Sequence, residues 1–188
     1  MFKYTILAVS LFLAACVNNS IAPPEEIAAA RVITDEAPSI SLITMINDNS
    51  GGGEHSALLI NGSQQILYDP AGTFRHSRVL RSADVMYGIT PPMADYYNSY
   101  HARFGYYVKI QKLDLSLAQA DALIARTQAE GAVPKLTCAR ATSDILNDFP
   151  QFAHIRTTYF PGRVMRLFGE VEGVVTVEVH EDDIGQNY

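Results

Sequence analysis

Positive charge is scarce in this sequence of 188 residues. It has 14 lysines and arginines against 20 aspartates and glutamates, which gives a formal net charge of −6. Only Arg75, Arg78 and Arg81 come close to forming a basic stripe, and we interpret these three as a solvated face. We therefore expect no nucleic-acid partner, because nucleic-acid-binding proteins meet the phosphates with a basic patch.

Metal-binding patterns are also missing. The sequence contains no His-Glu-x-x-His helix and no paired-cysteine knuckle, and its five histidines are scattered. We expect neither a metal site nor a cofactor. Charged residues make up only 18% of the chain and hydrophobic residues 48%, which is typical of an ordered protein. The length predicts one compact domain.

No apolar run is long enough to cross a bilayer, and the longest N-terminal one ends in a processing signal. Residues 4–13 are apolar and follow Lys3, and Leu13-Ala-Ala-Cys16 comes next. This ending resembles a bacterial lipobox, which implies cleavage before Cys16 and lipidation of Cys16. Val17 stands where aspartate would hold a Gram-negative lipoprotein at the inner membrane, so the outer membrane is expected, facing the periplasm.

The expected organisation has three parts. Residues 1–15 are a lipoprotein signal peptide, residues 16–38 are the lipidated cysteine and a flexible tether, and residues 39–188 are a single domain. The lipid is the expected link to the membrane.

Cys138 is the second of only two cysteines. It is predicted to open a helix that has Thr137 as its N-cap and ends before Pro150. The helix dipole favours a thiolate at this position. The alternative is a core cysteine that heads a buried stripe. Because lipidation of Cys16 would leave Cys138 unpaired in an exported protein, we favour a reactive thiol.

A predicted hairpin carries the best candidate base, His55. Strands at residues 54–60 and 64–69 flank an Asn-Gly turn signal. A three-residue loop places His55 opposite Asp69, whereas a two-residue turn places it opposite Tyr68. We favour Asp69, because a carboxylate orients an imidazole and stabilises its protonated form.

The other four histidines are weaker candidates. We predict surface positions for His76 and His101. His154 follows Cys138 by about four helical turns, too far to pair with it locally. His180 lies in an acidic tail.

The remaining patterns mix helices and strands. They predict a buried strand at 40–46, a helix with an aromatic face from residue 91, a strand at 106–115, and a capped helix ending at Gly131. A short helix at 163–168 and a last strand at 174–179 follow. The expected fold class is α+β.

Three segments together resemble a known family. They are Glu54-His55-Ser-Ala-Leu-Leu-Ile60, Leu67-Tyr-Asp-Pro-Ala-Gly72 and Leu136-Thr-Cys138-Ala-Arg-Ala-Thr-Ser-Asp-Ile-Leu146. They are similar to the circularly permuted NlpC-like papain-fold proteins, which include YiiX-type proteins and relatives of lecithin–retinol acyltransferase. The resemblance covers residues 40–149. It implies an antiparallel sheet packed against the N-terminus of the cysteine helix.

The resemblance also implies a function. Cys138 matches the nucleophile, His55 the base, and the third polar position falls at or next to Asp69, where the family often has histidine. The implied activity is a cysteine hydrolase, thiol protease or acyltransferase acting through an acyl-enzyme. The substrate would be an amide, as in peptidoglycan peptides, or an ester or thioester. The alternative is a non-catalytic envelope lipoprotein of the same fold that binds glycan or a partner protein.

Overall fold

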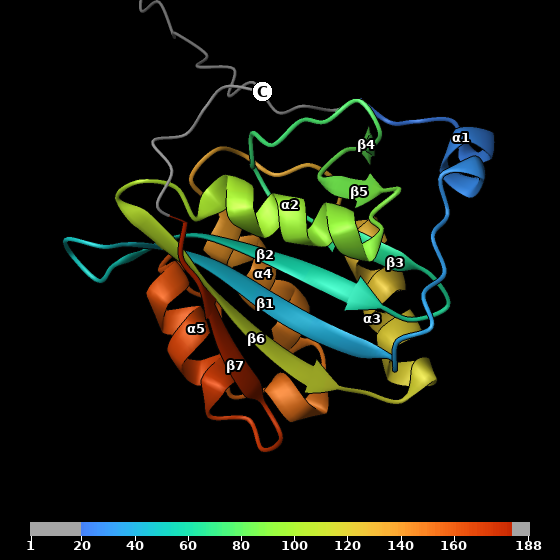
Figure 1. Cartoon of the computed structure of the whole chain (residues 1–188). Helices are drawn as coiled ribbons and strands as arrows, with labels where there is room; N and C mark the ends of the chain where they lie inside the picture. The colour runs from blue at the N-terminus through green and yellow to red at the C-terminus, as the bar shows by residue number, and fades with distance from the viewer. Residues whose placement is uncertain (1–19, 182–188) are drawn as a thin grey trace, which may run out of the picture.

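A seven-stranded antiparallel sheet forms the centre of the molecule, shown in a computed structural model that describes residues 20–181 (Figure 1). Its strands lie in the order β4-β5-β3-β2-β1-β6-β7. The predicted α+β class is therefore confirmed, with a wholly antiparallel sheet. The strand bounds are β1 Ser39–Asn47, β2 Gly53–Asn61, β3 Gln65–Tyr68, β4 Leu80–Ser82, β5 Val85–Tyr87, β6 Tyr106–Asp114 and β7 Val175–Val179.

Helices cover both faces of this sheet. In Figure 1, α2 crosses the front, and α3, α4 and α5 lie behind. No helix within residues 20–181 is long and apolar enough to cross a membrane. The helix bounds are α1 Pro24–Ala29, α2 Pro91–His101, α3 Leu117–Glu130, α4 Cys138–Asn147 and α5 Pro161–Gly169, with a 3₁₀ turn at Pro150–Phe152.

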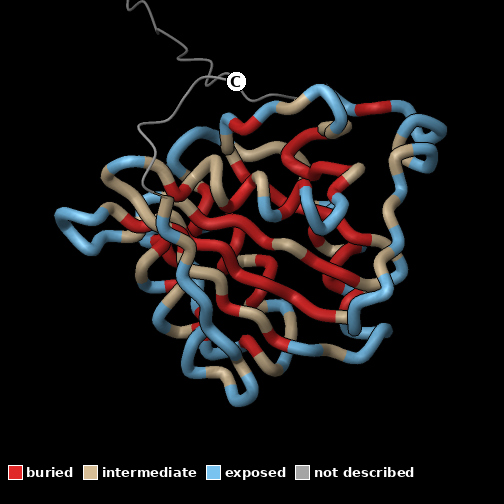
Figure 2. The backbone as a smooth tube through the Cα atoms, viewed as in Figure 1, coloured by how far each residue is buried: buried red, intermediate tan, exposed pale blue. Residues whose placement is uncertain are grey.

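Successive residues of the central strands pack against opposite layers of the core. Leu58 and Ile60 of β2 join the cluster formed with the three rear helices, whereas Ala57 joins the cluster under α2. This division follows from the two-residue period of a strand. The central strands are accordingly buried along most of their length, and the edge strand β7 is exposed (Figure 2).

The capping-box prediction for α3 is confirmed in detail. The Ser116 hydroxyl accepts from the Gln119 backbone N–H, and the Gln119 side chain accepts from the Ser116 backbone N–H. Gly131 follows the last helical residue. Two free N–H groups at the helix start are satisfied in this way.

The expected flexible tether differs from the structure over residues 20–38. This segment contains the short helix α1 and hydrogen-bonds to the domain at several points. Ala22 N donates to Ser82 Oγ at 3.1 Å, and Gln65 N donates to the Val32 carbonyl at 2.8 Å. The segment is therefore part of the folded domain, which extends back to residue 20. The predicted signal peptide and Cys16 lie outside the described residues.

Candidate active site

Helix α4 presents Cys138 as its first residue. Thr137 occupies the N-cap position, as predicted, but the predicted capping bond is wrong, because its hydroxyl donates to the Pro134 carbonyl at 2.7 Å. A second contact fixes the helix on the sheet: Ser56 Oγ donates to Thr142 Oγ1 at 3.3 Å. The face of α4 that carries Cys138 is buried, and Cys138 itself retains 8% exposure.

The β2–β3 hairpin adopts a register that neither predicted loop provides. Asn61 pairs with Gln65 and Leu58 with Tyr68, so residues 62–64 form the connection. Continued by one residue, this register places Asp69 beside Ala57, on the same face as His55.

The register separates the two candidates for the third position. His55 Nε2 lies 2.7 Å from Asp69 Oδ1. Tyr68 belongs to the core on the opposite face, where its hydroxyl has no hydrogen-bond partner among the described residues. The structure therefore pairs His55 with Asp69, not with Tyr68.

Asp69 is fully buried and is surrounded by donors. Besides His55, the Tyr97 hydroxyl donates to Oδ1 at 2.9 Å, and Arg81 Nη1 donates to Oδ2 at 3.2 Å. Burial alone would raise the pKa of Asp69. The hydrogen bond and charge of His55, together with the charge of Arg81, instead hold that pKa well below its usual range.

Arg81 extends this network toward the cysteine helix. Its Nη2 lies 2.7 Å from Asp84 Oδ1, and Asp84 Oδ2 accepts from the backbone N–H of Ala71 at 2.9 Å and of Val133 at 3.0 Å. Val133 belongs to the segment that leads into α4. The prediction that Arg81 belongs to a solvated face is wrong, because its side chain is largely buried between two carboxylates.

His55 links this carboxylate to Cys138. Because its Nε2 is bonded to Asp69, its Nδ1 is the nitrogen left for the sulfur. Burial would lower the pKa of His55, but hydrogen bonding to Asp69 and Cys138 and their negative charges raise it to about 10. A charged imidazolium is therefore the resting form at neutral pH.

The same interactions act on the thiol. Burial would raise the pKa of Cys138, but hydrogen bonding to His55 and its positive charge outweigh burial and lower it. Hydrogen bonding from the backbone of Ser56 and Ala139 also lowers the pKa of Cys138. Ser56 is free to do so because β3 ends at Tyr68, which leaves this edge of β2 unpaired. The site favours a thiolate–imidazolium pair.

His101 is the site residue that the sequence prediction missed. We predicted a surface position, but the residue ends α2, and its ring stacks on His55 with centroids 6.0 Å apart and an interplanar angle of 14°. Its Nδ1 lies 2.9 Å from the Tyr97 carbonyl. Burial, together with the positive charge of His55, lowers the pKa of His101 to about 4. The i, i+4 spacing of Tyr97 and His101 was the available signal.

The remaining histidines take no part in this cluster. His76 Nδ1 accepts from the Arg78 backbone N–H, His154 Nε2 bonds the Leu167 carbonyl, and His180 is exposed beside Glu178.

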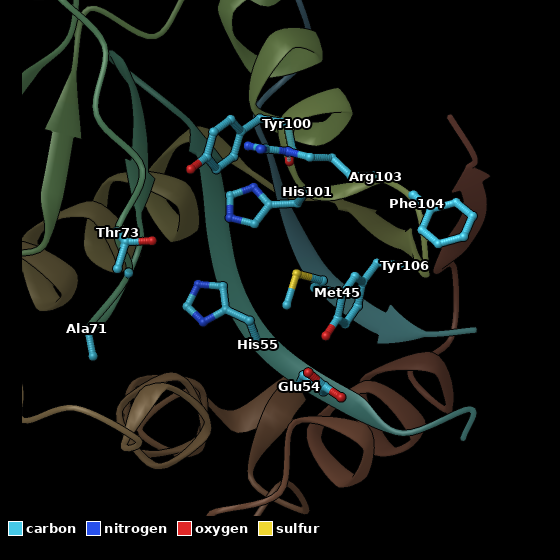
Figure 3. A pocket seen from close by; sticks show the side chains of 11 residues that line it. Met45, Glu54, His55, Ala71, Thr73, Tyr100, His101, Arg103, Phe104 and Tyr106 are labelled. Atoms are coloured by element: carbon cyan, nitrogen blue, oxygen red, sulfur yellow. Dashed lines mark hydrogen bonds between the residues drawn. The ribbon is translucent and has the colours of Figure 1, made fainter. Parts of the chain in front are cut away.

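A pocket of about 590 Å³ opens beside His55 (Figure 3). Residues from β1, β2, the end of α2 and the turn after it, the start of β6 and the loop after β3 line it. Cys138 is not among them. The lining residues are Met45, Glu54, His55, Ala71, Gly72, Thr73, Tyr100, His101, Arg103, Phe104 and Tyr106.

Comparison with known proteins gives no relative: no family model, no curated protein and no solved structure matches the chain. Within residues 20–181, no three histidine, cysteine, aspartate or glutamate side chains are grouped as a metal site would require. The geometry of the site is that of a histidine oriented by a buried carboxylate, and this histidine lowers the pKa of Cys138.

Proposed function

We propose that the protein is a Cys/His-dependent hydrolase or acyltransferase that forms an acyl-enzyme on Cys138. The observation that carries this proposal is the set of hydrogen bonds that His55, Arg81 and Tyr97 make with Asp69, together with the lowering of the Cys138 pKa by His55. A core cysteine requires none of these charged partners. A nucleophile requires a base, and the base requires a group that holds its tautomer.

The proposed reaction begins when the Cys138 thiolate attacks the carbonyl carbon of the substrate. The carbonyl oxygen becomes an oxyanion, for which the backbone N–H groups of Ser56 and Ala139 are the proposed donors once the sulfur has lost its charge. Collapse breaks the bond to the leaving group, which takes the proton from His55. This leaves a thioester on Cys138 and a neutral imidazole.

The second half restores the enzyme. A water, amine or alcohol gives its proton to His55 as it attacks the thioester carbonyl, and the carbon–sulfur bond breaks to return the thiolate. Asp69 stabilises the imidazolium in both halves. The substrate supplies an amide, ester or thioester carbonyl, and no cofactor enters the scheme.

The proposed fold family is the permuted papain-like group. The order of the elements in the chain supports this proposal, because strand β2 with His55 precedes helix α4 with Cys138. The packing of the sheet against the start of α4 supports it as well. With the predicted lipid on Cys16, we place the protein in the outer membrane facing the periplasm, where amide bonds of peptidoglycan peptides are the abundant candidate substrate. An ester, thioester or lipid amide involves the same chemistry.

The reactivity of Cys138 tests the proposed function directly. At pH 7 we expect iodoacetamide to alkylate Cys138 at least about tenfold faster than an unperturbed thiol, because only the thiolate is nucleophilic. His55→Ala is expected to remove this advantage. Peptide mass spectrometry over a time course measures both rates. A wild-type rate equal to that of free cysteine, or a rate indifferent to His55→Ala, argues for a core cysteine.

The pH dependence of that reaction provides a second test. An ordinary thiol with a pKa near 8.5 gains roughly 25-fold in thiolate between pH 7 and 9. Cys138 is expected to gain much less, because its pKa is lowered and part of its thiolate is already formed at pH 7. His55→Ala should restore the steeper rise. In proton NMR, the His55 ring should titrate near pH 10 and remain protonated below it.

A further inference from the structure

The pocket beside His55 contains an arginine that forms no ion pair among the described residues. Arg103 lies in the turn after α2, and its guanidinium stacks over the Tyr100 ring, 3.7 Å from the ring centroid. Its Nε donates to the Tyr100 carbonyl. Neither terminal nitrogen makes a hydrogen bond or ion pair with any residue between 20 and 181. The guanidinium is therefore held in place, and its two terminal nitrogens are available to bind a ligand.

Positive charge also surrounds His101 in this pocket wall. The charges of both Arg103 and His55 act on its ring. Figure 3 shows the Arg103 guanidinium beside Tyr100, with His101 below it and His55 below His101. The one carboxylate among the lining residues, Glu54, lies at the opposite end of the cavity and pairs with no described cation.

The rest of the lining is mostly apolar or aromatic. Met45, Ala71, Phe104 and Tyr106 contribute to it, and the volume suits a ligand group of small-molecule size. An apolar cavity with one fixed guanidinium selects a group that joins hydrophobic surface to a negative charge. Since His55 belongs both to this pocket and to the proposed catalytic pair, a ligand held here lies beside the proposed base.

Building on the proposed function, we propose that this pocket binds a carboxylate of the substrate through Arg103. The substrate class is then an amide, ester or thioester that carries a carboxylate a few bonds from the reacting carbonyl. The two terminal nitrogens of Arg103 match the two oxygens of a carboxylate. A neutral substrate of the same shape lacks the negatively charged oxygens that these nitrogens would bind.

The test is a binding measurement on the full-length Cys138→Ala protein, in which no turnover occurs. Hippurate, an aromatic amide with a carboxylate, and hippuramide, its neutral isostere, are titrated by calorimetry and by chemical-shift changes at His101. We expect hippurate to bind at least about tenfold more tightly than hippuramide. Arg103→Gln should weaken hippurate binding by about the same factor and leave hippuramide within twofold.

Two matched variants control for general electrostatics. Arg163→Gln removes an exposed arginine of α5 that lies outside the pocket lining, and should change neither affinity. Glu54→Gln removes the negative charge at the far end of the pocket, and should leave hippurate binding unchanged or tighter.

The proposal is overturned if neither probe binds, if the two probes bind equally, or if Arg163→Gln matches Arg103→Gln. Because alkylation of Cys138 is not involved, the outcome is independent of the test of the proposed function. If binding depends on Arg103 but Cys138 is unreactive, the protein binds carboxylates and the proposed enzyme activity is rejected. If Cys138 is alkylated fast but no such binding is found, the proposed enzyme activity stands and its substrate belongs to another class.

Discussion

Asp69→Asn is expected to lower the free energy of unfolding by about 3 kcal/mol and catalytic turnover by about 10³-fold. His55, Tyr97 and Arg81 all donate to the Asp69 carboxylate. Whichever way an asparagine amide is turned, its NH₂ group confronts one of these donors in a fully buried position. Arg81 also loses half of its compensating charge, because only Asp84 remains beside it.

Three measurements test the effect of Asp69→Asn. Urea unfolding reports the stability, the NMR titration of the His55 ring should show its pKa falling from about 10, and the iodoacetamide rate of Cys138 should fall with it. Asp95→Asn is the matched control, because this aspartate is exposed on α2 and makes no side-chain hydrogen bond or ion pair among the described residues. Asp95→Asn should change none of the three. If Asp69→Asn also leaves the titration of His55 unchanged, the carboxylate is not what holds the imidazolium.

Local patterns were enough to predict the elements that carry the site. The apolar, β-branched run at residues 40–46 and the alternation at residues 106–115 correspond to β1 and β6, and the capping box predicted the start of α3. The position of Cys138 at a helix start also followed from local signals, because the Thr137 N-cap and Pro150 bracket a run of helical spacing. These features depend on interactions between residues a few positions apart, and such local patterns can be seen in a single sequence.

The features that were missed depend on contacts between distant segments. The 62–64 connection is set by packing along the whole hairpin rather than by the Asn-Gly pair alone, so the register could not be obtained from the turn signal. Arg81 looked solvated because the buried carboxylate of Asp69 comes from another turn of the chain, and only Asp84 is its neighbour in sequence. His101 reaches His55 only because α2 crosses the sheet over β2.

One consequence of the network is that the approach to α4 and the orientation of His55 depend on the same buried charges. Asp84 bonds the segment before Cys138 through Val133, and bonds the turn after Asp69 through Ala71. Arg81 joins Asp84 to Asp69. Nucleophile, base and carboxylate come from three segments, and this shared core of two carboxylates and one guanidinium holds them in register. Displacing the Asp69 carboxylate should therefore disturb all three.

The smallest change that should displace it is Gly72→Ala. A Cβ at Gly72 would lie 1.9 Å from Asp69 Oδ2 and 2.1 Å from its Cγ, far inside any real contact. The carboxylate cannot swing aside without losing the hydrogen bond to His55, Tyr97 or Arg81. We expect a stability loss of about 3 kcal/mol and alkylation of Cys138 slowed about tenfold or more, by the same route as in Asp69→Asn.

The direction of this effect separates it from an ordinary glycine replacement. Gly→Ala at an unstrained position stabilises a protein by about 0.4–1 kcal/mol, because the unfolded chain loses freedom. Gly162→Ala is the matched control: its Cβ would meet Gly53 N at 3.5 Å, an ordinary contact, and it lies in α5. Unfolding should be easier in Gly72→Ala and unchanged or harder in Gly162→Ala. If both variants gain stability and keep fast alkylation of Cys138, the turn after Asp69 can shift to accommodate the added Cβ. The close contact between Gly72 and the Asp69 carboxylate is then not what positions the site.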